Sequence, residues 1–322
     1  MPVYNGAKYL SEAIESILNQ TFNDFEFLII DDRSTDNSIE IIKSYKDRRI
    51  RLVENKQNLG QAETMNRGLG LADGRYVARM DQDDISLSSR LDKQVELMEK
   101  NPQIGVCGTW IKYTGYQNSI LELETENDLI KIKLLTNQNL AHPTVIIRKS
   151  VLDEYSLKYD DQYSPAEDYD LWVRASKFCG FTNIPEPLVN YRLHENQGSE
   201  ITGEHQSKIA NRVRKRLIES VGVHIKNNDL LIHNTVFCGE DSDSLTINEV
   251  FRYLKRLQSS NRQKNLFEPI AFDEFIRSNW KRFIYKVDLT IRVKVFKQLF
   301  LPRASFWDAG DKLSFLFRLG QS

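Results

Sequence analysis

The sequence predicts an α/β fold in which helices flank a mostly parallel sheet, followed by a helical extension. Strand-type apolar runs alternate with amphipathic helical stretches over the first 200 of the 322 residues. Acidic groups directly follow two of these runs, at Asp31-Asp32 and Asp81-Gln82-Asp83, and an open α/β sheet binds its ligands at the carboxyl ends of strands. Beyond residue 204 the pattern becomes helical and basic. This length suits one large domain with an appendage.

Up to residue 100 the apolar pattern switches between two periods. Apolar side chains at spacings of three and four predict helices at 9–18, 39–45, 61–72 and 89–100. Short apolar and β-branched runs predict strands at 25–30, 50–53 and 75–80. Cap and turn residues separate them, such as Ser34-Thr35-Asp36 and Asn58-Leu59-Gly60. Strands that are joined through helices in this way pair in parallel.

Between residues 100 and 204 the pattern is less regular. It predicts strands at 104–111 and 142–148 and helices at 128–135 and 168–177, whereas 113–125 is loop-like. Residues 181–194 contain Pro185 and Pro187, and proline is excluded from central strands. We therefore expect an irregular connection there, leading to Tyr191-Arg192-Leu193-His194.

Charge divides the chain into two parts. Residues 1–204 hold 23 basic and 33 acidic residues, whereas residues 205–322 hold 21 basic and 12 acidic residues. We expect a catalytic domain over 1–204 and a basic, mainly helical extension over 205–322. An acidic half that binds cations, joined to a basic tail that faces an anionic surface, would explain the split. A solvated helical face explains the tail equally well.

The most basic stretch of the extension runs from Lys281 to Arg303. It has seven basic residues against one acidic residue, interleaved with Phe283, Tyr285, Phe296 and Phe300. Its apolar pattern fits both a strand and a helix, and the context favours a helix. Two interpretations stay open: a helix that lies on anionic lipid, and a helix that packs on the catalytic domain.

Cysteine usage and hydropathy point to a cytoplasmic protein. The three cysteines, Cys107, Cys179 and Cys238, are far apart and show no metal-ligand spacing, as expected of free thiols in a reducing compartment. No apolar run approaches the roughly 18 residues that span a bilayer, and the first residues lack a signal-peptide pattern. We expect a cytoplasmic location, with peripheral contact to the inner face of the cell membrane as an open alternative, and no nucleic-acid partner.

The acidic motifs indicate a metal and a base. Alternation sends residues i and i+2 to one side of an extended chain, so Asp81 and Asp83 face one crevice. Hard carboxylate oxygens suit Mg²⁺ or Mn²⁺, which would bridge the phosphates of a nucleotide diphosphate. Glu167-Asp168 opens a helix, whose dipole keeps a carboxylate ionised. An acidic turn without a ligand and simple helix capping are the competing interpretations.

Several motifs in a fixed order resemble the family-2 glycosyltransferases of the GT-A fold. They are Pro2-Val3-Tyr4-Asn5-Gly6, Ile30-Asp31-Asp32-Arg33-Ser34-Thr35-Asp36, Asn58-Leu59-Gly60 with Asn66, Gly68, Ala72 and Gly74, and Met80-Asp81-Gln82-Asp83-Asp84. The resemblance covers roughly residues 1–200. It implies a GT-A (Rossmann-like) fold and a metal-dependent, inverting enzyme that moves one sugar from a UDP- or dTDP-type nucleotide sugar to a glycan or lipid-linked acceptor, as in bacterial surface polysaccharide synthesis.

The resemblance also implies a role for each motif. Donor and nucleotide contacts fall on Pro2, Tyr4, Asp32, Arg33, Asn58, Gly60, Asp81 and Arg192. Asp32 would accept a hydrogen bond from a pyrimidine N–H, although Asp31 and Asp32 could simply cap the next helix. Asp83 would bind the metal, assisted by His194, and Asp168 would be the catalytic base. The alternative for His194 is a structural or exposed side chain without a ligand, since this is the more common state of a lone histidine. His142 would contact the acceptor or the donor sugar.

In one respect the chain departs from this pattern. Members of the family begin with a short apolar strand immediately before the Pro-Val-Tyr-Asn segment, and Met1 stands where that strand would end. The strand would be central in the sheet, so its absence would leave unpaired backbone and exposed apolar neighbours. We expect Met1 to be an internal methionine of a longer reading frame, or the gene to be truncated.

Rival functions can be compared with the same motifs. A sugar-phosphate nucleotidyltransferase would need a Gly-rich phosphate loop near the N-terminus, and residues 2–10 contain only Gly6. A receiver-type phosphoacceptor domain is much shorter and leaves 166–194 unexplained. A catalytically inactive nucleotide-sugar-binding relative stays open. Processive synthases carry a Gln-x-x-Arg-Trp motif and membrane helices, and neither occurs in this sequence.

Overall fold

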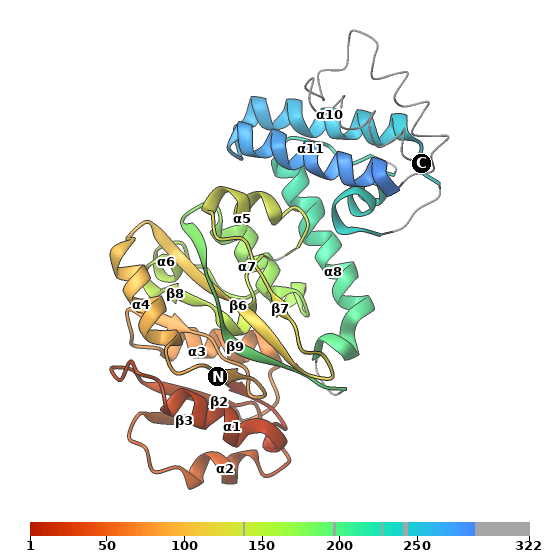
Figure 1. The fold of residues 1–322 in the computed structure, drawn as a ribbon. Coiled ribbons are helices and arrows are strands. Elements are labelled where there is room, and N and C mark those ends of the chain that lie inside the picture. Colours follow the sequence, from red (N-terminus) through yellow and green to blue (C-terminus); the bar gives the residue numbers. More distant parts are fainter. Residues whose placement is uncertain (138, 196–197, 227, 241–243, 287–322) are drawn as a thin grey trace. The chain divides into compact units, whose positions relative to one another are not determined.

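The computed structural model describes residues 1–137, 139–195, 198–226, 228–240 and 244–286 (Figure 1). The chain divides into two compact units, Met1–Arg214 and Lys215–Ser322. Helix α8 (Gly198–Ser220) runs through residue 204, where the charge pattern predicts a domain boundary. No helix in the described part of the chain is long and apolar enough to cross a membrane.

The first sheet is parallel, as the alternation of strands and helices predicts. Its order is β1 (Pro2–Val3), β2 (Phe27–Asp31) and β3 (Ile50–Glu54). Helix α1 (Ala7–Leu18) links β1 to β2, and α2 (Ser38–Ser44) links β2 to β3. Apolar side chains from these strands and helices, joined by Met80 from a later segment of the chain, form one core: Val3, Leu10, Ile14, Ile17, Phe27, Ile29, Ile42 and Met80.

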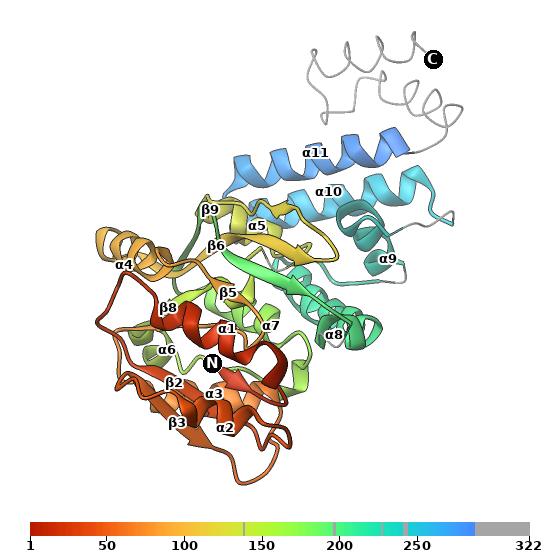
Figure 2. The same cartoon turned by 60° about the horizontal axis from the view of Figure 1, so that its bottom comes forward.

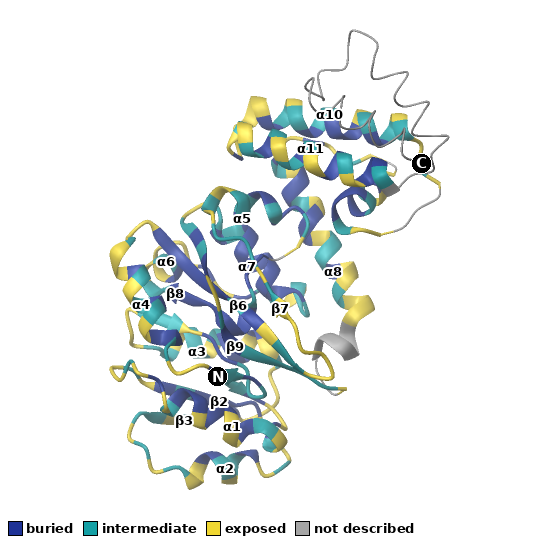
Figure 3. Ribbon diagram, viewed as in Figure 1, coloured by how far each residue is buried: buried dark blue, intermediate teal, exposed yellow. Residues whose placement is uncertain are grey.

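The second sheet is mixed. Its order is β4 (Tyr76–Ala78), β8 (Ile146–Arg148), β6 (Ile104–Gly115), β9 (Gly180–Leu193) and β5 (Ile85–Ser86), and β7 (Ile120–Leu121) pairs with β6. Only β6 and β9 run parallel, and they lie side by side along their length (Figure 2). The other pairs are antiparallel. Buried residues gather along these strands (Figure 3).

Two expectations about loops are wrong. Residues 181–193 belong to strand β9, and the ladder shifts register between Ile184, opposite Thr109, and Pro187, opposite Trp110. The prolines are tolerated because they lie at this irregularity, where ladder hydrogen bonds are interrupted. The stretch 113–125 is also partly extended, since β6 continues to Gly115 and β7 pairs back onto it. Conversely, His142–Thr144 forms a 3-10 turn before β8, where a continuous strand is predicted.

Further helices of the first unit lie close to their predicted positions: α3 (Gln61–Leu71), α4 (Arg90–Lys100), α5 (Asn127–Lys133) and α7 (Glu167–Ala175). The short helix α6 (Lys149–Glu154) was not predicted. Helix α4 packs on β6 and β9, with Met98 buried against Cys107 and Leu188. Helix α7 is buried almost throughout and includes Trp172, which is fully inaccessible.

The described part of the second unit is helical, as predicted. It contains α9 (Asp229–His233), a π-helical stretch (Asn234–Cys238), α10 (Ile247–Lys264) and α11 (Pro269–Lys286). Thr246 and Glu249 form a capping box that satisfies the first backbone N–H groups of α10. Apolar faces of α10 and α11, including Leu254 and Trp280, are buried. Most of the basic stretch 281–303 lies outside the described residues.

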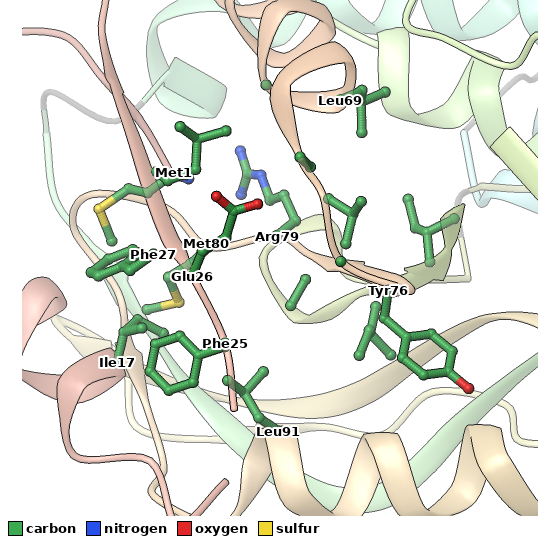
Figure 4. A pocket seen from close by; sticks show the side chains of 18 of the residues that line it. Met1, Ile17, Phe25, Glu26, Phe27, Leu69, Tyr76, Arg79, Met80 and Leu91 are labelled. Carbon is green, nitrogen blue, oxygen red and sulfur yellow. Dashed lines mark hydrogen bonds between the residues drawn. The ribbon is translucent and has the colours of Figure 1, made fainter. Parts of the chain in front are cut away.

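A cavity of about 660 Å³ separates the two sheets near the N-terminus (Figure 4). Met1 and Leu28 line it from the first sheet, and Tyr76, Ala78 and Arg79 line it from the end of the second. The Met1 amino group donates to the Leu28 carbonyl over 2.9 Å, and burial lowers the pKa of this amine to about 5. Among the described residues, no strand pair joins the two sheets.

Candidate functional site

Three carboxylates converge just after β4. One oxygen each of Asp81, Asp83 and Asp84 lies within 4.8 Å of the others. Burial raises the pKa of Asp81 against the lowering effect of Arg79, and it raises that of Asp84 well above its ordinary value. Repulsion among the three groups adds to both shifts. Asp84 Oδ2 is buried and has no hydrogen-bond partner among the described residues. This hard oxygen set fits Mg²⁺ or Mn²⁺.

The end of β9 brings two basic residues to these carboxylates. His194 Nε2 lies 2.9 Å from Asp83 Oδ2. The Arg192 backbone N–H donates to Asp84 Oδ1 over 2.9 Å, and Arg192 Nε donates to the Asp83 carbonyl over 3.0 Å. This approach follows from the pairing of β5 with β9, because β5 begins at Ile85, directly after the acidic motif. Arg192 and His194 therefore lie beside the predicted metal ligands.

Three further side chains support this cluster and carry no signal in the sequence pattern. Buried Arg79 forms an ion pair with Asp81. Glu12 pairs with the Arg192 guanidinium over 2.9 Å. The Arg192 guanidinium also lies 4.5 Å from the centre of the Tyr9 ring, at cation–π distance. These groups come from segments far apart in the sequence, so only the folded chain identifies them.

The two neighbouring aspartates at the end of β2 have different partners. Asp32 accepts hydrogen bonds from Asn55 Nδ2 (2.7 Å) and from the backbone N–H groups of Leu59 (2.8 Å) and Gly60 (2.9 Å). Asp31 instead accepts from the N–H groups that follow it in the turn. A carboxylate offers about four acceptor positions, so Asp32 has one left for a ligand. Asp32 thus fixes the 58–60 loop by hydrogen bonds. Its contact with a nucleotide base stays a prediction.

Hydrogen bonds to Gln82 connect the N-terminal motif (residues 2–6) to the acidic motif (residues 81–84). The Tyr4 N–H donates to Gln82 Oε1 (2.9 Å), and Gln82 Nε2 donates to the Tyr4 carbonyl (3.1 Å). A side chain at Gly6 would collide with Gln82, because an added Cβ would meet Oε1. Tyr4 is 47% exposed, so its ring is accessible to a ligand. Pro2 lies opposite Ile30 in the sheet, and Arg33 follows Asp32 with a positive φ of 68°.

Asp168 lies at the start of α7, as predicted, and is buried. Its Oδ1 accepts the Tyr169 N–H (2.7 Å), and its Oδ2 lies 3.8 Å from His142 Nδ1. His142 Nε2 in turn lies 2.9 Å from the Tyr159 hydroxyl. The charge of Arg79, which pairs with Asp81, also lowers the pKa of His142. Arg79 therefore lies close both to the acidic cluster and to the neighbours of Asp168.

A groove of about 250 Å³ opens beside Asp168. Its walls are the start of α7 and one face of α8, where small side chains recur at Gly203, Ser207 and Ala210. Polar groups of Gln206 and Asn137 also line it. The groove thus offers hydrogen-bonding groups around one carboxylate, which suits a ligand with hydroxyl groups.

Comparisons with known proteins agree with these motifs. The family model for glycosyl transferase family 2 matches residues 1–156. An uncharacterised glycosyltransferase of Haemophilus influenzae is 35% identical over 245 residues, covering 69% of this chain and 74% of the relative. The UDP-Glc:alpha-D-GlcNAc-diphosphoundecaprenol beta-1,3-glucosyltransferase WfgD of Escherichia coli is 32% identical over 209 residues, covering 62% and 80%.

A solved structure shares the fold. The crystal structure of S. aureus TarS residues 1–349 in complex with UDP-GlcNAc superposes with a TM-score of 0.60 at 18% sequence identity. The match covers 92% of this chain and 90% of that chain. At this level of identity the likeness shows the fold alone.

Proposed function

Since this chain belongs to the family-2 glycosyltransferases, with their GT-A fold, we propose that it transfers one sugar from a nucleotide-diphosphate donor to an acceptor hydroxyl with inversion. The observation that carries the proposal is the cluster of Asp81, Asp83 and Asp84, with the unpartnered Asp84 oxygen among them. Such a cluster is costly unless a cation neutralises it. One relative supports a donor of UDP type, because WfgD is named for UDP-Glc.

Asp83, Asp84 and His194 would hold a divalent ion. That ion would neutralise the departing diphosphate when bound. Arg79 forms an ion pair with Asp81 and lowers the pKa of that carboxyl against the larger effect of burial; Asp81 would contact hydroxyl groups of the donor. The Arg192 side chain, held by Glu12 and the Asp83 carbonyl, adds positive charge beside the phosphates.

Asp32, Tyr4, Pro2 and Arg33 would form the nucleotide side of the site. The exposed Tyr4 ring offers a flat surface for a base. The hydrogen bonds between the Tyr4 backbone and the Gln82 side chain keep it next to the acidic motif. The fourth acceptor position of Asp32 would take a pyrimidine N–H, while its other positions hold Leu59 and Gly60. Asn58 and Gly60 would then close this side as a loop.

Asp168 would take the acceptor proton. Inversion requires a single displacement in which the hydroxyl attacks the anomeric carbon from the face opposite the diphosphate, so a base must stand on the acceptor side. Asp168 borders the polar groove between α7 and α8, and the start of a helix favours its ionised form. We propose that this groove binds a saccharide hydroxyl of a glycan or lipid-linked acceptor. WbnJ, an O-antigen biosynthesis glycosyltransferase of Escherichia coli, is 34% identical over 205 residues and supports a role in surface polysaccharide synthesis.

Release of nucleoside diphosphate from a panel of nucleotide sugars tests the proposal. We expect release that depends on Mn²⁺ or Mg²⁺ and is lost in Asp83→Asn and Asp168→Asn, while Asp168→Asn still binds UDP. An absence of metal-dependent turnover with every donor, alongside retained UDP binding, would instead indicate an inactive nucleotide-sugar-binding relative. Turnover by Asp168→Asn would contradict the assignment of the base.

We also propose a cytoplasmic enzyme that contacts the inner face of the cell membrane through the segment Lys281–Arg303. The seven basic residues and interleaved aromatic side chains of this segment support it. Co-sedimentation of the full chain with vesicles should then require anionic lipid and weaken at high salt. Equal sedimentation with neutral vesicles, or none with either, would favour a helix packed within the protein.

A further inference from the structure

Tyr159, His142 and Asp168 form a buried line of polar side chains, in which His142 has only a predicted sugar contact and Tyr159 has no role in the proposed transfer. The Tyr159 hydroxyl lies 2.9 Å from His142 Nε2, and His142 Nδ1 lies 3.8 Å from Asp168 Oδ2. All three residues are buried. The ring of His142 therefore stands between a phenol and the predicted base, with one nitrogen toward each.

The surroundings of His142 keep its ring neutral. Burial lowers the pKa of His142 well below its ordinary value, and the charge of Arg79 lowers it further. Burial also raises the pKa of Tyr159, so the phenol keeps its proton. The other charged groups near Tyr159 are Asp81, Glu167 and Asp168. A neutral imidazole carries one N–H, and its position has two alternatives.

The two tautomers differ in what faces Asp168. If Nε2 carried the proton and donated it to Tyr159, the bare lone pair of Nδ1 would face a carboxylate oxygen, which is repulsive. If Tyr159 donates to Nε2, the proton is on Nδ1 and faces Asp168, which is attractive. The neighbouring phenol and carboxylate thus favour the same tautomer.

Backbone contacts hold Tyr159 in this position. Asn66 accepts the Tyr159 N–H (2.8 Å) and donates to the Tyr159 carbonyl (2.9 Å), which ties Tyr159 to α3. The His142 ring also contacts Trp172 edge-on, with centroids 6.1 Å apart. Both sides of the imidazole are therefore constrained by packed groups.

We propose that His142 is a positioning residue: Tyr159 fixes its Nδ1–H tautomer, and this N–H holds Asp168 Oδ2 while the Tyr169 N–H holds Oδ1. The 3.8 Å separation is longer than a hydrogen bond. We expect it to shorten when substrates bind, because catalytic contacts commonly tighten in the complex. The inference rests on the proposed function only for the role of Asp168 as the base. The tautomer itself follows from the local contacts.

Nitrogen NMR of the full chain labelled with ¹⁵N-histidine tests the tautomer without any substrate. Five histidines contribute signals, and His142→Gln identifies the one that matters. We expect a neutral ring with Nδ1 protonated from pH 8 down to pH 6, and a mixture of tautomers in Tyr159→Phe. Tyr155→Phe is the matched control, because Tyr155 is exposed and stacks on Phe178 instead. A proton on Nε2, or a cationic ring at pH 7, would overturn the inference.

Kinetics of donor turnover test the positioning role. In Tyr159→Phe we expect kcat to fall about tenfold, a loss typical of removing a residue that orients a functional side chain. The KM for the donor should stay unchanged. The acidic limb of the kcat profile should move to higher pH. His142→Asn, which keeps a donor on the Asp168 side, should retain more activity than His142→Ala. A normal kcat and a normal pH profile in Tyr159→Phe would refute the positioning role of His142, even if Asp168→Asn is inactive. An active Asp168→Asn would instead refute the assignment of Asp168 as the base and would leave the NMR result unaffected.

Discussion

At the scale of single residues, neighbours of one chemical type have separate tasks. Asp31 binds the backbone of its own turn, whereas Asp32 binds a loop almost thirty residues away. In the acidic motif, Asp81 has a cationic partner in Arg79, while one oxygen of Asp84 has none among the described residues. The environment therefore decides which aspartate stabilises the fold and which one is left for a ligand.

Asp84→Asn should have opposite effects on stability and on metal binding. The raised pKa of Asp84 means that its stabilising contribution is present below about pH 4 and is lost as pH rises through the folded-state pKa, so the charged form destabilises the protein at pH 8. We expect the metal-free variant to be about 1 kcal/mol more stable at pH 8 than the parent. Thermal unfolding with and without Mn²⁺ measures both effects.

The variant should also lose most of the stabilisation by Mn²⁺, which for the parent is about 2.7 kcal/mol at a hundredfold excess over Kd. Asp92→Asn, in an exposed position of α4, is the matched control and should behave like the parent. Undiminished stabilisation by Mn²⁺ in Asp84→Asn would contradict the metal site.

His142 should make the protein sensitive to acid. Its pKa is lowered in the folded state, so the unfolded chain takes up a proton first as pH falls below about 6.5. The free energy of unfolding should then fall by up to about 1.4 kcal/mol per pH unit below that value. Urea titrations between pH 7.5 and 5 should show this slope in the parent and a smaller one in His142→Gln. The exposed His205 gives the control, since His205→Gln should keep the parental slope.

At the scale of elements, the strand pairings assemble the site. Strand β9 carries Arg192 at its end, and its pairing with β5 brings this residue to an acidic loop more than a hundred positions earlier. A bulge next to Pro187 allows β9 to remain extended despite its prolines. Helix α7 starts at Glu167, so Asp168 lies in its first turn, close to the 3-10 turn that carries His142.

The turn at Gly60 should be more sensitive to a side chain than the helical position Gly70. Gly60 precedes α3 with a φ of +81°, and its N–H donates to Asp32. Gly60→Ala should cost about 1–2 kcal/mol, because L-residues are strained at positive φ, and should weaken UDP binding through the displaced loop. Gly70→Ala is the control: Gly70 is helical with open space around it, so alanine should be neutral or stabilising. Equal stability changes in urea unfolding would argue against this role of the turn.

At the scale of the molecule, two sheets within the first unit border one apolar cavity. Residues of β1 and β2 line one side of it and β4 lines the other; β1 and β4 are the end strands of their sheets, and the two-residue β1 leaves part of β2 unpaired on that side. The alternate backbone groups of β4 face away from β8, toward this space. An extended apolar segment placed there could pair with both edges and bury the surrounding side chains.

An engineered extension before Met1 tests this interpretation of the cavity. Four added residues of the sequence Val-Ile-Val-Ile should raise the Tm of the full chain by several degrees, because they bury apolar surface and satisfy edge hydrogen bonds. An extension of equal length with prolines at alternate positions cannot donate these hydrogen bonds and should have little effect. Hydrogen exchange at Leu28 and Ala78 should slow only in the apolar version. Equal Tm changes for both extensions would refute strand pairing.

Much of the fold and of the site could be predicted before any coordinates. The periods of the apolar residues located the helices of the first unit within a few residues, except for the short α6, because such periods follow from local backbone geometry and need several turns to be visible. The spacing of Asp81 and Asp83 predicted their convergence for the same reason. The path of β9 was mistaken because local proline rules could not include a bulge that its partner strand permits.

The sequence alone determined the family, the parallel first sheet and the carboxylates of the acidic motif. The tertiary structure decided the partners of those residues: Arg79 for Asp81, Gln82 for Tyr4, and the Tyr159–His142 pair beside Asp168. These contacts join residues brought together by strand pairing and burial. Such neighbours shift the pKa of a side chain, and they cannot be identified from positions in the sequence because they are distant along the chain.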